Sequence, residues 1–421
     1  MKKLLKKIFH TFGFDIIRAS REGILHKPEK YVGTDYKTLP ITILRDEENS
    51  TFFGYHDKTP FSKSGTKVLA CSVSQNNSNS SDFGEKMKLG VFEKGADGIF
   101  QPSFQKFAET ETWCWQQGCM LQWNPIQPEN EVFFNTKVNG RLGAYLYDID
   151  KKEKLREFSQ PFYAIDPTGR YAASLNFIRL GVLRPGYGYD DSKNTEIINS
   201  APKDDGIYLI NLKTGKSELI INLKELAEYT NKNVYHYINH ITFSPSGRYI
   251  TFFHIYQNKF NHRLVRFYLY DLKSQTLKLL EANNRVSHYC WRSDEQLLTT
   301  ELEKNGKVGY YLYNFIDKNK VEIELMNIGD FHPMFNPLQS DIIVADTIPD
   351  RNRNQHLFIM DINKIRQKHV GTFYTPEKFS GPFRCDLHPR WDRNGTCIVV
   401  DTTQDGLRAM ALIDVSGCNV L

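Results

Sequence analysis

The feature that most constrains this chain is a repeated unit. In each copy an apolar run with a large apolar anchor leads into a polar turn and a second apolar run. Seven copies can be placed along the sequence, with anchors at Phe61, Trp123, Ile165, Phe243, Trp291, Phe335 and Trp391. Their spacing scatters around the ~40–50 residues per blade typical of β-propellers, with insertions in the longer intervals.

A second series of strands is interleaved with the first, in segments such as GAYLYDIDKKEK, RFYLYDLKSQTLK and GYYLYNFIDKN. Apolar and polar residues alternate in each segment, and many segments end at Asp, Asn or Gly, which is typical of a half-buried strand entering a turn. A small sheet cannot bury both of its faces alone, so such sheets stack face to face in a closed ring. We therefore predict an all-β fold, a seven-bladed β-propeller over residues 39–421.

Two segments bear on how the ring is built. Residues 39–45 (LPITILR) form a free strand ahead of the first unit, which we expect to complete the last blade and join the two ends of the chain. The long interval between Ile165 and Phe243 leaves an eight-bladed ring as the rival arrangement. The other explanation is a loop over one face, because residues 179–206 are rich in Gly, Asp, Asn and aromatic residues.

The charge is unevenly distributed. Residues 1–30 carry eight Lys or Arg against three Asp or Glu, a net charge of +5, which equals the formal net charge of the whole 421-residue chain. The remaining sequence is therefore neutral overall. Nucleic acid is excluded as a partner on bulk electrostatics, because such binding depends on a cationic surface.

The N-terminal segment, residues 1–30, begins with MKKLLKKIFHTFGFDIIR, in which an apolar helical stripe opposes lysines. This pattern predicts a short basic amphipathic helix lying on an anionic membrane surface. Packing against the side of the propeller is the alternative. The segment lacks the features of a secretion signal and is too short and too charged to span a bilayer. With seven scattered cysteines and no CxxC, we expect a cytoplasmic protein, peripheral on the inner face of the cell membrane.

Four histidines occupy one position of the repeat, three residues ahead of an anchor: His240, His288, His332 and His388. In a propeller this register places four imidazoles from consecutive blades around one mouth of the central channel. Cys385 and Asp386 lie just upstream of His388, and neutral imidazoles with a thiolate or carboxylate suit a divalent metal such as zinc or manganese. The alternative is that each histidine caps a strand through backbone hydrogen bonds.

Other polar residues near this register could contact a substrate. Uronic-acid β-elimination needs a base, an acid and a cation that neutralises the carboxylate, which His, Tyr and Arg can supply. We predict five residues with catalytic roles: His240, His254, Tyr187, Tyr189 and Arg184. We predict five substrate contacts: His56, Asp57, Arg179, Tyr256 and Arg390. Local packing or a loop salt bridge is the alternative for each. No Asp/Glu pair recurs in the channel register, so glycoside hydrolysis is less well supported.

The strings VSHYCW, DFHPMFNP and RCDLHPRWDRNG resemble the propeller-fold polysaccharide lyases. These are the oligogalacturonate and ulvan lyases and their relatives in bacterial surface-polysaccharide gene clusters. The resemblance spans roughly residues 50–416 and is strongest after His236. It implies an anionic-glycan site on one propeller face and a histidine-rich metal site in the channel.

In the oligogalacturonate lyases, histidines and a glutamine three residues ahead of one of them hold the metal. Cys385 occupies that place before His388. The resemblance thus implies His288, His332, Cys385 and His388 as ligands, and a thiolate favours zinc over manganese, in a structural rather than catalytic role.

These observations favour a carbohydrate-active propeller that acts on an acidic bacterial surface glycan by lyase-like β-elimination. One alternative is a glycosyltransferase or assembly factor of capsule or O-antigen biosynthesis at the cytoplasmic membrane face, although no Gly-rich phosphate loop or DxD motif supports a nucleotide-sugar site. Another is a non-enzymatic scaffold, because propellers often bind partners.

Overall fold

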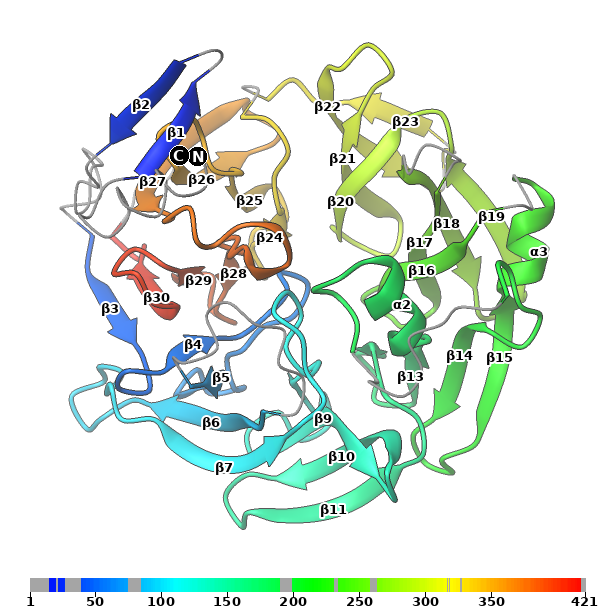
Figure 1. The fold of residues 1–421 in the computed structure, drawn as a ribbon, viewed down its shortest axis with the longest axis horizontal. Coiled ribbons are helices and arrows are strands. Elements are labelled where there is room, and N and C mark those ends of the chain that lie inside the picture. The colour runs from blue at the N-terminus through cyan, green and yellow to red at the C-terminus, as the bar shows by residue number, and fades with distance from the viewer. Residues whose placement is uncertain are drawn as a thin grey trace.

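The computed structural model describes residues 15–19, 22–26, 39–74, 85–189, 199–230, 234–257, 263–315, 317, 319–325 and 328–417. Within these residues, seven four-stranded antiparallel sheets surround a central axis (Figure 1). The predicted seven-bladed β-propeller is therefore confirmed. The long interval between Ile165 and Phe243 holds the last three strands of one blade together with helices and loops, and no eighth blade among the described residues.

The first three blades follow one another along the chain. Blade 1 consists of β4 (Ser50–Phe52), β5 (Lys67–Val73), β6 (Met87–Glu93) and β7 (Gln105–Thr110). Blade 2 consists of β8 (Gln122–Trp123), β9 (Glu131–Val138), β10 (Arg141–Asp148) and β11 (Glu153–Phe158). Blade 3 consists of β12 (Ala164–Ile165), β13 (Tyr171–Ser174), β14 (Gly206–Asn211) and β15 (Ser217–Asn222).

The next three blades repeat the same order from the inner to the outer strand. Blade 4 consists of β16 (His236–Phe243), β17 (Tyr249–Gln257), β18 (Arg263–Asp271) and β19 (Thr276–Glu281). Blade 5 consists of β20 (Arg285–Trp291), β21 (Gln296–Leu302), β22 (Val308–Asn314) and β23 (Asn319–Glu322). Blade 6 consists of β24 (Met334–Phe335), β25 (Ile342–Asp346), β26 (Asn354–Asp361) and β27 (Arg366–Tyr374).

Blade 7 joins the two ends of the propeller. It consists of β28 (Arg390–Trp391), β29 (Cys397–Thr402), β30 (Ala409–Asp414) and β3 (Ile41–Leu44). The strand β3 pairs antiparallel with β30, so that Ile41 lies opposite Ile413 and Leu44 opposite Met410. The prediction that residues 39–45 complete the last blade is confirmed.

The anchors of the repeat lie where neighbouring blades meet. Six of them are the last residue of an innermost strand, and Phe61 forms an isolated bridge with Val68 at the same place in blade 1. The indole of Trp123 donates to the Pro60 carbonyl at 2.8 Å, and that of Trp391 donates to the Met334 carbonyl at 3.2 Å. These large side chains fill the space between adjacent sheets, which is why the repeat depends on them.

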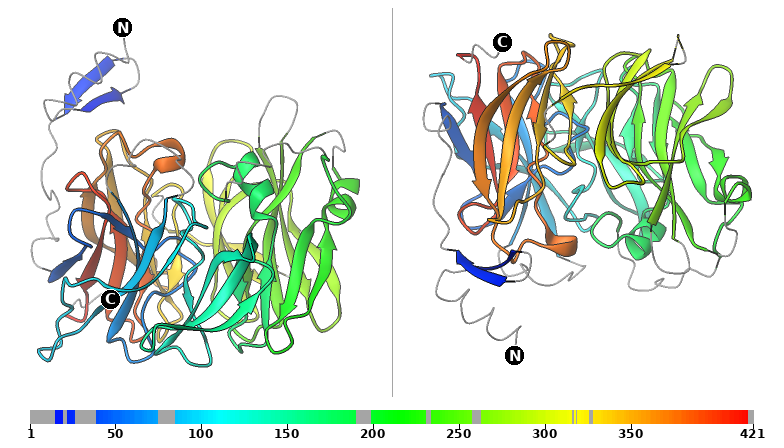
Figure 2. Two further views of the ribbon diagram at one scale, coloured as in Figure 1. Left: turned by 60° about the horizontal axis from the view of Figure 1, so that its bottom comes forward. Right: turned by 90° about the horizontal axis from the view of Figure 1, so that it is seen from above.

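The insertion in blade 3 lies over one face of the ring. It begins with α2 (Phe177–Leu183), which is capped by Asn176, whose side chain accepts from the Arg179 N–H. Figure 2 shows α2 on one face of the propeller, and Figure 1 shows it close to the axis. A second helix, α3 (Leu223–Glu228), follows β15, and a 3-10 turn, η3 (Gly381–Phe383), precedes blade 7.

The expectation of an N-terminal helix is wrong for residues 15–18. There β1 (Asp15–Ala19) pairs with β2 (Glu22–His26), and Ile16 and Ile17 lie opposite Leu25 and Ile24. Ile16, Ile17 and Ile24 are β-branched, which favours extended backbone over helix. Residues 1–14 of the expected helix lie outside the described residues. In the described part of the chain, no helix is long and apolar enough to cross a membrane.

Candidate active site at one mouth of the channel

A segment of blade 1, residues 53–57, reaches the axis between β4 and β5. Gly54 has a φ of +134°, and a Cβ there would meet the Gln117 backbone at 3.0 Å, so only glycine fits. The Asp401 carboxylate accepts from the N–H groups of Phe53 and Gly54 at 3.1 and 3.3 Å. Blade 7 therefore fixes the path of this segment from blade 1.

Arg390 belongs to this support and does not contact the cavity. It is fully buried, its Nε donates to the Tyr55 carbonyl at 3.1 Å, and its Nη2 donates to the Gly54 carbonyl and to Asp401. The predicted substrate-binding role is therefore replaced by a positioning role, because every contact found for its guanidinium is internal.

The four histidines of the repeat converge around His56. The ring centre of His56 lies 5.4 Å from that of His240, 5.8 Å from His288, 5.1 Å from His332 and 6.0 Å from His388. Adjacent rings are closer, with 4.0 Å between His288 and His332 and 4.5 Å between His332 and His388. One position of the sequence repeat thus becomes one cluster in space.

Each imidazole of the ring has its Nδ1 engaged. The partner of His240 is the Tyr55 hydroxyl at 3.1 Å, and that of His388 is the Gly54 carbonyl at 2.8 Å. The partners of the other two are carboxylates: Asp330 contacts His288 and Asp346 contacts His332, both at 2.9 Å. A neutral ring that donates from Nδ1 keeps a lone pair on Nε2 that can bind a ligand, whereas the Tyr55 hydroxyl can pair with either tautomer of His240.

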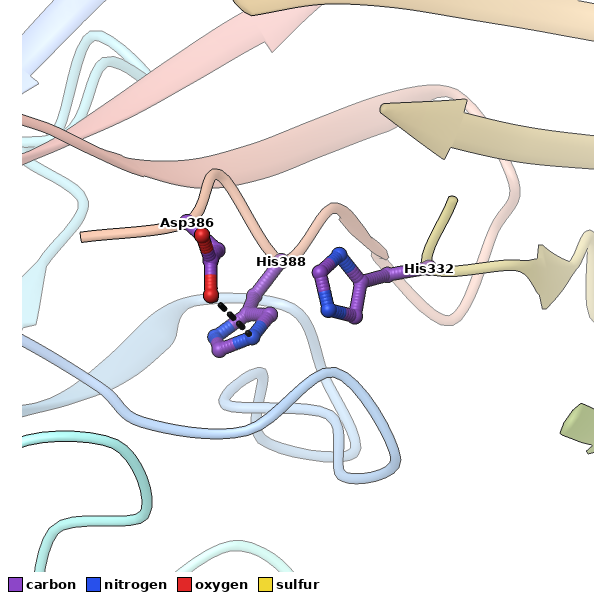
Figure 3. A group of neighbouring side chains, drawn as sticks. All are labelled: His332, Asp386 and His388. Carbon is purple, nitrogen blue, oxygen red and sulfur yellow. Dashed lines mark ion pairs between the residues drawn. The ribbon is translucent and has the colours of Figure 1, made fainter. Parts of the chain in front are cut away.

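Three of the clustered residues can share a cation. Ligand atoms of His332, Asp386 and His388 all lie within 4.8 Å of one another, and all three residues are buried (Figure 3). Asp386 and His388 lie two residues apart ahead of β28, and the Asp386 carboxylate is 3.9 Å from His388 Nε2. His332 arrives from the segment ahead of β24.

Cys385 is not part of this group. Its thiol is buried and approaches the Asp386 carbonyl at 3.9 Å, and burial raises its pKa to about 12, so the uncharged form dominates. The backbone directs the neighbouring carboxylate to the cluster instead. His288 is also outside the group, although its ring contacts His332.

Burial sets the protonation of the cluster. It lowers the pKa of His56, His240, His288 and His388, and neighbouring cations and imidazoles lower each further, so these rings are neutral. Burial opposes charge on His332 too, but the Asp346 carboxylate outweighs it and raises the pKa of His332 to about 9. Burial would raise the pKa of Asp386, but Arg384 and His332 lower it, which keeps the carboxylate ionised.

A cavity of about 300 Å³ opens beside the cluster. Its rim and walls include four arginines, namely Arg184, Arg263, Arg285 and Arg384. His288, His332, Asp330 and Asp386 also line it, and Tyr187 lies among them. The guanidinium groups outnumber the carboxylates, which makes this cavity suited to an anionic ligand.

Tyr187 is an acid–base group of the cavity wall that lies between two arginines. The guanidinium of Arg184 lies 3.9 Å from its ring centre, and Arg384 donates to its hydroxyl and, at 2.8 Å, to Asp386. Burial would raise the pKa of Tyr187, but the two arginines outweigh burial and lower it. Arg184 has no carboxylate partner among the described residues.

Several predicted residues face elsewhere. In β17, Phe253 and Ile255 line the cavity, so His254 and Tyr256 point to the other side of the sheet, where both stack on His236. His254 is also hydrogen-bonded to His236 at 2.9 Å. Successive side chains of a strand point to opposite faces of the sheet, so these two residues do not reach the cavity.

Four further predictions are corrected or refined. Tyr189 stacks on Phe177 at 4.4 Å, and its hydroxyl accepts from Asn135 at 2.8 Å, inside the core. The Arg179 guanidinium donates to backbone carbonyls, among them that of His236, and so fastens α2 to β16. Asp57 pairs with Lys58 at 2.9 Å, away from the cavity wall. His240 is buried and bonded through Nδ1 to the Tyr55 hydroxyl at 3.1 Å, and it does not line the cavity.

Four residues that line the cavity were not predicted from the sequence: Arg263, Arg285, Arg384 and Asp330. The signal for Asp330 was present, because DFHP and DLHP both place an aspartate two residues before a ring histidine. Asp330 and Asp386 are those two residues. For the arginines no local signal distinguishes a residue lining the cavity from a solvated one.

Comparison with solved structures agrees with this architecture. An oligogalacturonate lyase in complex with manganese has a TM-score of 0.64 at 13% identity, and the match covers 96% of each chain. An oligogalacturonate lyase from Vibrio parahaemolyticus has a TM-score of 0.63 at 12% identity, covering 90% of this chain and 97% of that one. The tricorn protease has a TM-score of 0.50 at 11% identity, with 95% of this chain matching 36% of that chain. No protein-family model and no curated protein matches the sequence.

At such identities the likeness establishes the fold. The chain is a seven-bladed β-propeller similar to those of the oligogalacturonate lyases, along nearly its full length. The predicted link to surface-polysaccharide gene clusters remains a prediction.

Proposed function

We propose that the protein binds an acidic oligosaccharide, of the kind found in bacterial surface polysaccharides, and cleaves it by β-elimination. The observation that carries this proposal is the cavity of about 300 Å³ that combines four arginines, Tyr187 and the edge of an imidazole cluster. The likeness to two oligogalacturonate lyases supports the same class of chemistry.

The residues present fit a divalent cation. Nε2 of His388 is buried with no hydrogen-bond partner among the described residues, and its Nδ1 is fixed by the Gly54 carbonyl. We propose that His332, Asp386 and His388 hold the cation, which when bound would help to neutralise the substrate carboxylate. Two imidazoles and a carboxylate suit zinc and manganese alike, and the preference for zinc loses its basis with Cys385 outside the group.

The protein's own residues supply the remaining chemistry. Arg184, with no carboxylate partner of its own, pairs with the substrate carboxylate and acidifies the proton on the adjacent carbon. Tyr187, as tyrosinate, takes that proton while a carbon–carbon double bond forms and the bond to the leaving sugar oxygen breaks. The proton then passes from Tyr187 to that oxygen. This assignment gives Tyr187 the role that the sequence analysis gave to His240 and His254.

The test is a panel of uronic-acid oligosaccharides, including oligogalacturonate, followed by ultraviolet absorbance of the unsaturated product and by calorimetric binding. We expect binding and product formation for at least one acidic sugar, and loss of product but not of binding in Tyr187→Phe. Neither binding nor cleavage of any acidic oligosaccharide in the panel would contradict the proposal.

We also propose, from the sequence, that the N-terminal segment brings the protein to the inner face of the cell membrane. The support is the net charge of +5 over residues 1–30 and the apolar stripe beside it. Such a location would suit a role in capsule or O-antigen metabolism. Flotation with anionic liposomes, with and without residues 1–20, tests it. Equal flotation of the two forms would contradict it.

A further inference from the structure

His56 is the one residue of the imidazole cluster that comes from outside the repeat register. It lies on residues 53–57 at the centre of the ring, and only 1% of its surface is exposed. Neither of its ring nitrogens has a hydrogen-bond partner among the described residues. Because an imidazole carries one donor and one acceptor, leaving both unpaired in the interior is unfavourable.

The surroundings of His56 point to a cation as the missing partner. Nε2 of His388, whose Nδ1 faces the Gly54 carbonyl, is also buried and unpaired, as is Nε2 of His240, so several imidazole nitrogens around His56 lack partners among the described residues. Water could satisfy one such atom, whereas several neighbouring imidazole nitrogens suit a metal ion better.

We propose that His56 is a further ligand of the divalent cation held by His332, Asp386 and His388. Its ring centre lies 5.1 Å from that of His332 and 6.0 Å from that of His388. Two imidazoles bound to one ion at ~2.1 Å have ring centres roughly 5 Å apart. The inference rests on the metal site of the proposed function and adds to it a ligand from blade 1.

With this ligand set, the cation would join the first and last blades of the propeller at a second place. The strand β3 already joins the N-terminal part of the chain to β30 at the outside of blade 7. The cation would join blade 1, through His56, to blades 6 and 7 at the inside. The same seam is tied by the Gly54 carbonyl, which accepts from His388, and by Asp346, which accepts from the N–H groups of His332 and His388 at 2.9 and 3.0 Å.

The ligands are therefore arranged before the ion arrives. Asp346 links the two histidine segments to each other, and Asp401 and Arg390 fix the segment that carries His56. Binding should then raise the thermal stability of the whole propeller without a change in secondary structure. That readout is independent of any reaction on a sugar.

The test uses the full-length protein, stripped with a chelator, with Mn²⁺ and Zn²⁺ added separately. Binding is followed by calorimetry and elemental analysis, and the unfolding midpoint is measured with and without each ion. We expect one ion per chain and a higher midpoint for the wild type. In His56→Ala and His56→Leu we expect affinity to fall roughly 100-fold, and the rise in midpoint to disappear. The leucine variant keeps most of the side-chain volume, offers no ligand atom and guards against a simple packing defect.

The matched control is His254→Ala, another buried imidazole, which lies on the face of β17 away from the cavity and contacts His236. It should bind the ion as the wild type does. If both His56 variants kept wild-type affinity and the full rise in midpoint, the proposal would be overturned, while sugar binding measured separately would still stand. If the wild type bound neither ion, the proposal would also fall, and the arginine-lined sugar site would be judged by its own assay.

Discussion

The two halves of the propeller use the same backbone position for different purposes. In blades 4 to 7 the residue three places ahead of each anchor is a histidine, and all four rings converge on the axis. In blades 1 to 3 the equivalent residues are Lys58, Met120 and Phe162. Met120 and Phe162 pack in the core, the latter against Phe158 at 4.8 Å.

Comparing the two halves distinguishes the backbone conformation at this position from the chemistry that its side chain provides. Met120 and His240 both have a φ of +56°, and His388 has a φ of +45°. Such left-handed backbone is strained for residues other than glycine and is often associated with function. Here it occurs at three of the seven equivalent positions and in both halves, so it does not depend on imidazole, and the chemistry depends on whether imidazole occupies the position.

The largest effect should come from the hydroxyl that we place in the reaction. Tyr187→Phe should lower kcat by ~10²–10⁴-fold, because it removes the proton acceptor while leaving the ring against Arg184. Its control is Tyr189→Phe, which alters a core hydroxyl bonded to Asn135 and should cost ~1 kcal/mol of unfolding free energy with unchanged kcat. Steady-state kinetics and chemical denaturation measure the two. If the two variants lost kcat equally, the assignment of Tyr187 to the reaction and of Tyr189 to the core would be contradicted.

The pH profile should report the same group. A base must be deprotonated, so kcat/KM should rise with pH through the pKa of Tyr187, which Arg184 and Arg384 lower against the opposing effect of burial. Arg384→Gln removes one of these charges, so the rise should move to higher pH. If the pH profile of kcat/KM were unchanged in this variant, a group other than Tyr187 would be responsible for the rise.

A smaller effect is expected from the carboxylate that orders two ligands. Asp346→Asn weakens the contacts to His332 and His388, so affinity for Mn²⁺ should fall ~10–100-fold. Asp166→Asn is the control in blade 3, where a buried aspartate accepts from Thr168 at 2.9 Å in a turn. It should lower the midpoint of unfolding without altering ion affinity, measured by calorimetry. Loss of ion binding in both variants would indicate a general effect of destabilisation.

Removal of the Arg184 guanidinium charge, which has no carboxylate partner among the described residues, should weaken substrate binding alone. Arg184→Met keeps the packing against Tyr187 and removes the charge, and we expect affinity for an acidic oligosaccharide to fall ~10–100-fold, or about 1.4–2.8 kcal/mol. A neutral oligosaccharide of the same length is the control ligand, and its binding should not change. Calorimetry with both ligands makes the comparison, and equal losses would contradict a charge-specific role.

The sequence was informative wherever one residue type recurs at one position. The anchors, the closing strand at 39–45 and the histidine register all depend on such recurrence, and each reappears in the structure. It failed where the outcome depends on which side of a strand a residue faces. His254 and Tyr256 flank Ile255, which lines the cavity, and one step along a strand reverses the direction of the side chain.

In the insertion of blade 3, the positions of the side chains could not be predicted for a different reason. Arg184, Tyr187 and Tyr189 lie within a few residues of one another, yet only the first two reach the cavity. Their separation depends on how α2 ends and on the contact of Tyr189 with Phe177, which no periodic pattern reveals. Cys385 and Asp386 show the same limit, because neighbouring residues face opposite environments and only the carboxylate joins the metal-binding group.

The smallest effect should come from the counterpart position in the other half. Met120→Leu exchanges two side chains of similar volume at a buried site with the same left-handed backbone as His240. Such a swap should change the free energy of unfolding by less than ~1.5 kcal/mol and leave ion and sugar binding at wild-type values. His240→Leu, at the matching position of blade 4, removes the imidazole bonded to Tyr55 at 3.1 Å, so it should disturb the cluster as well as the fold. If Met120→Leu altered ion affinity as strongly as His240→Leu does, the division of the ring into a chemical half and a structural half would be wrong. The blades would then have to be treated as one coupled unit.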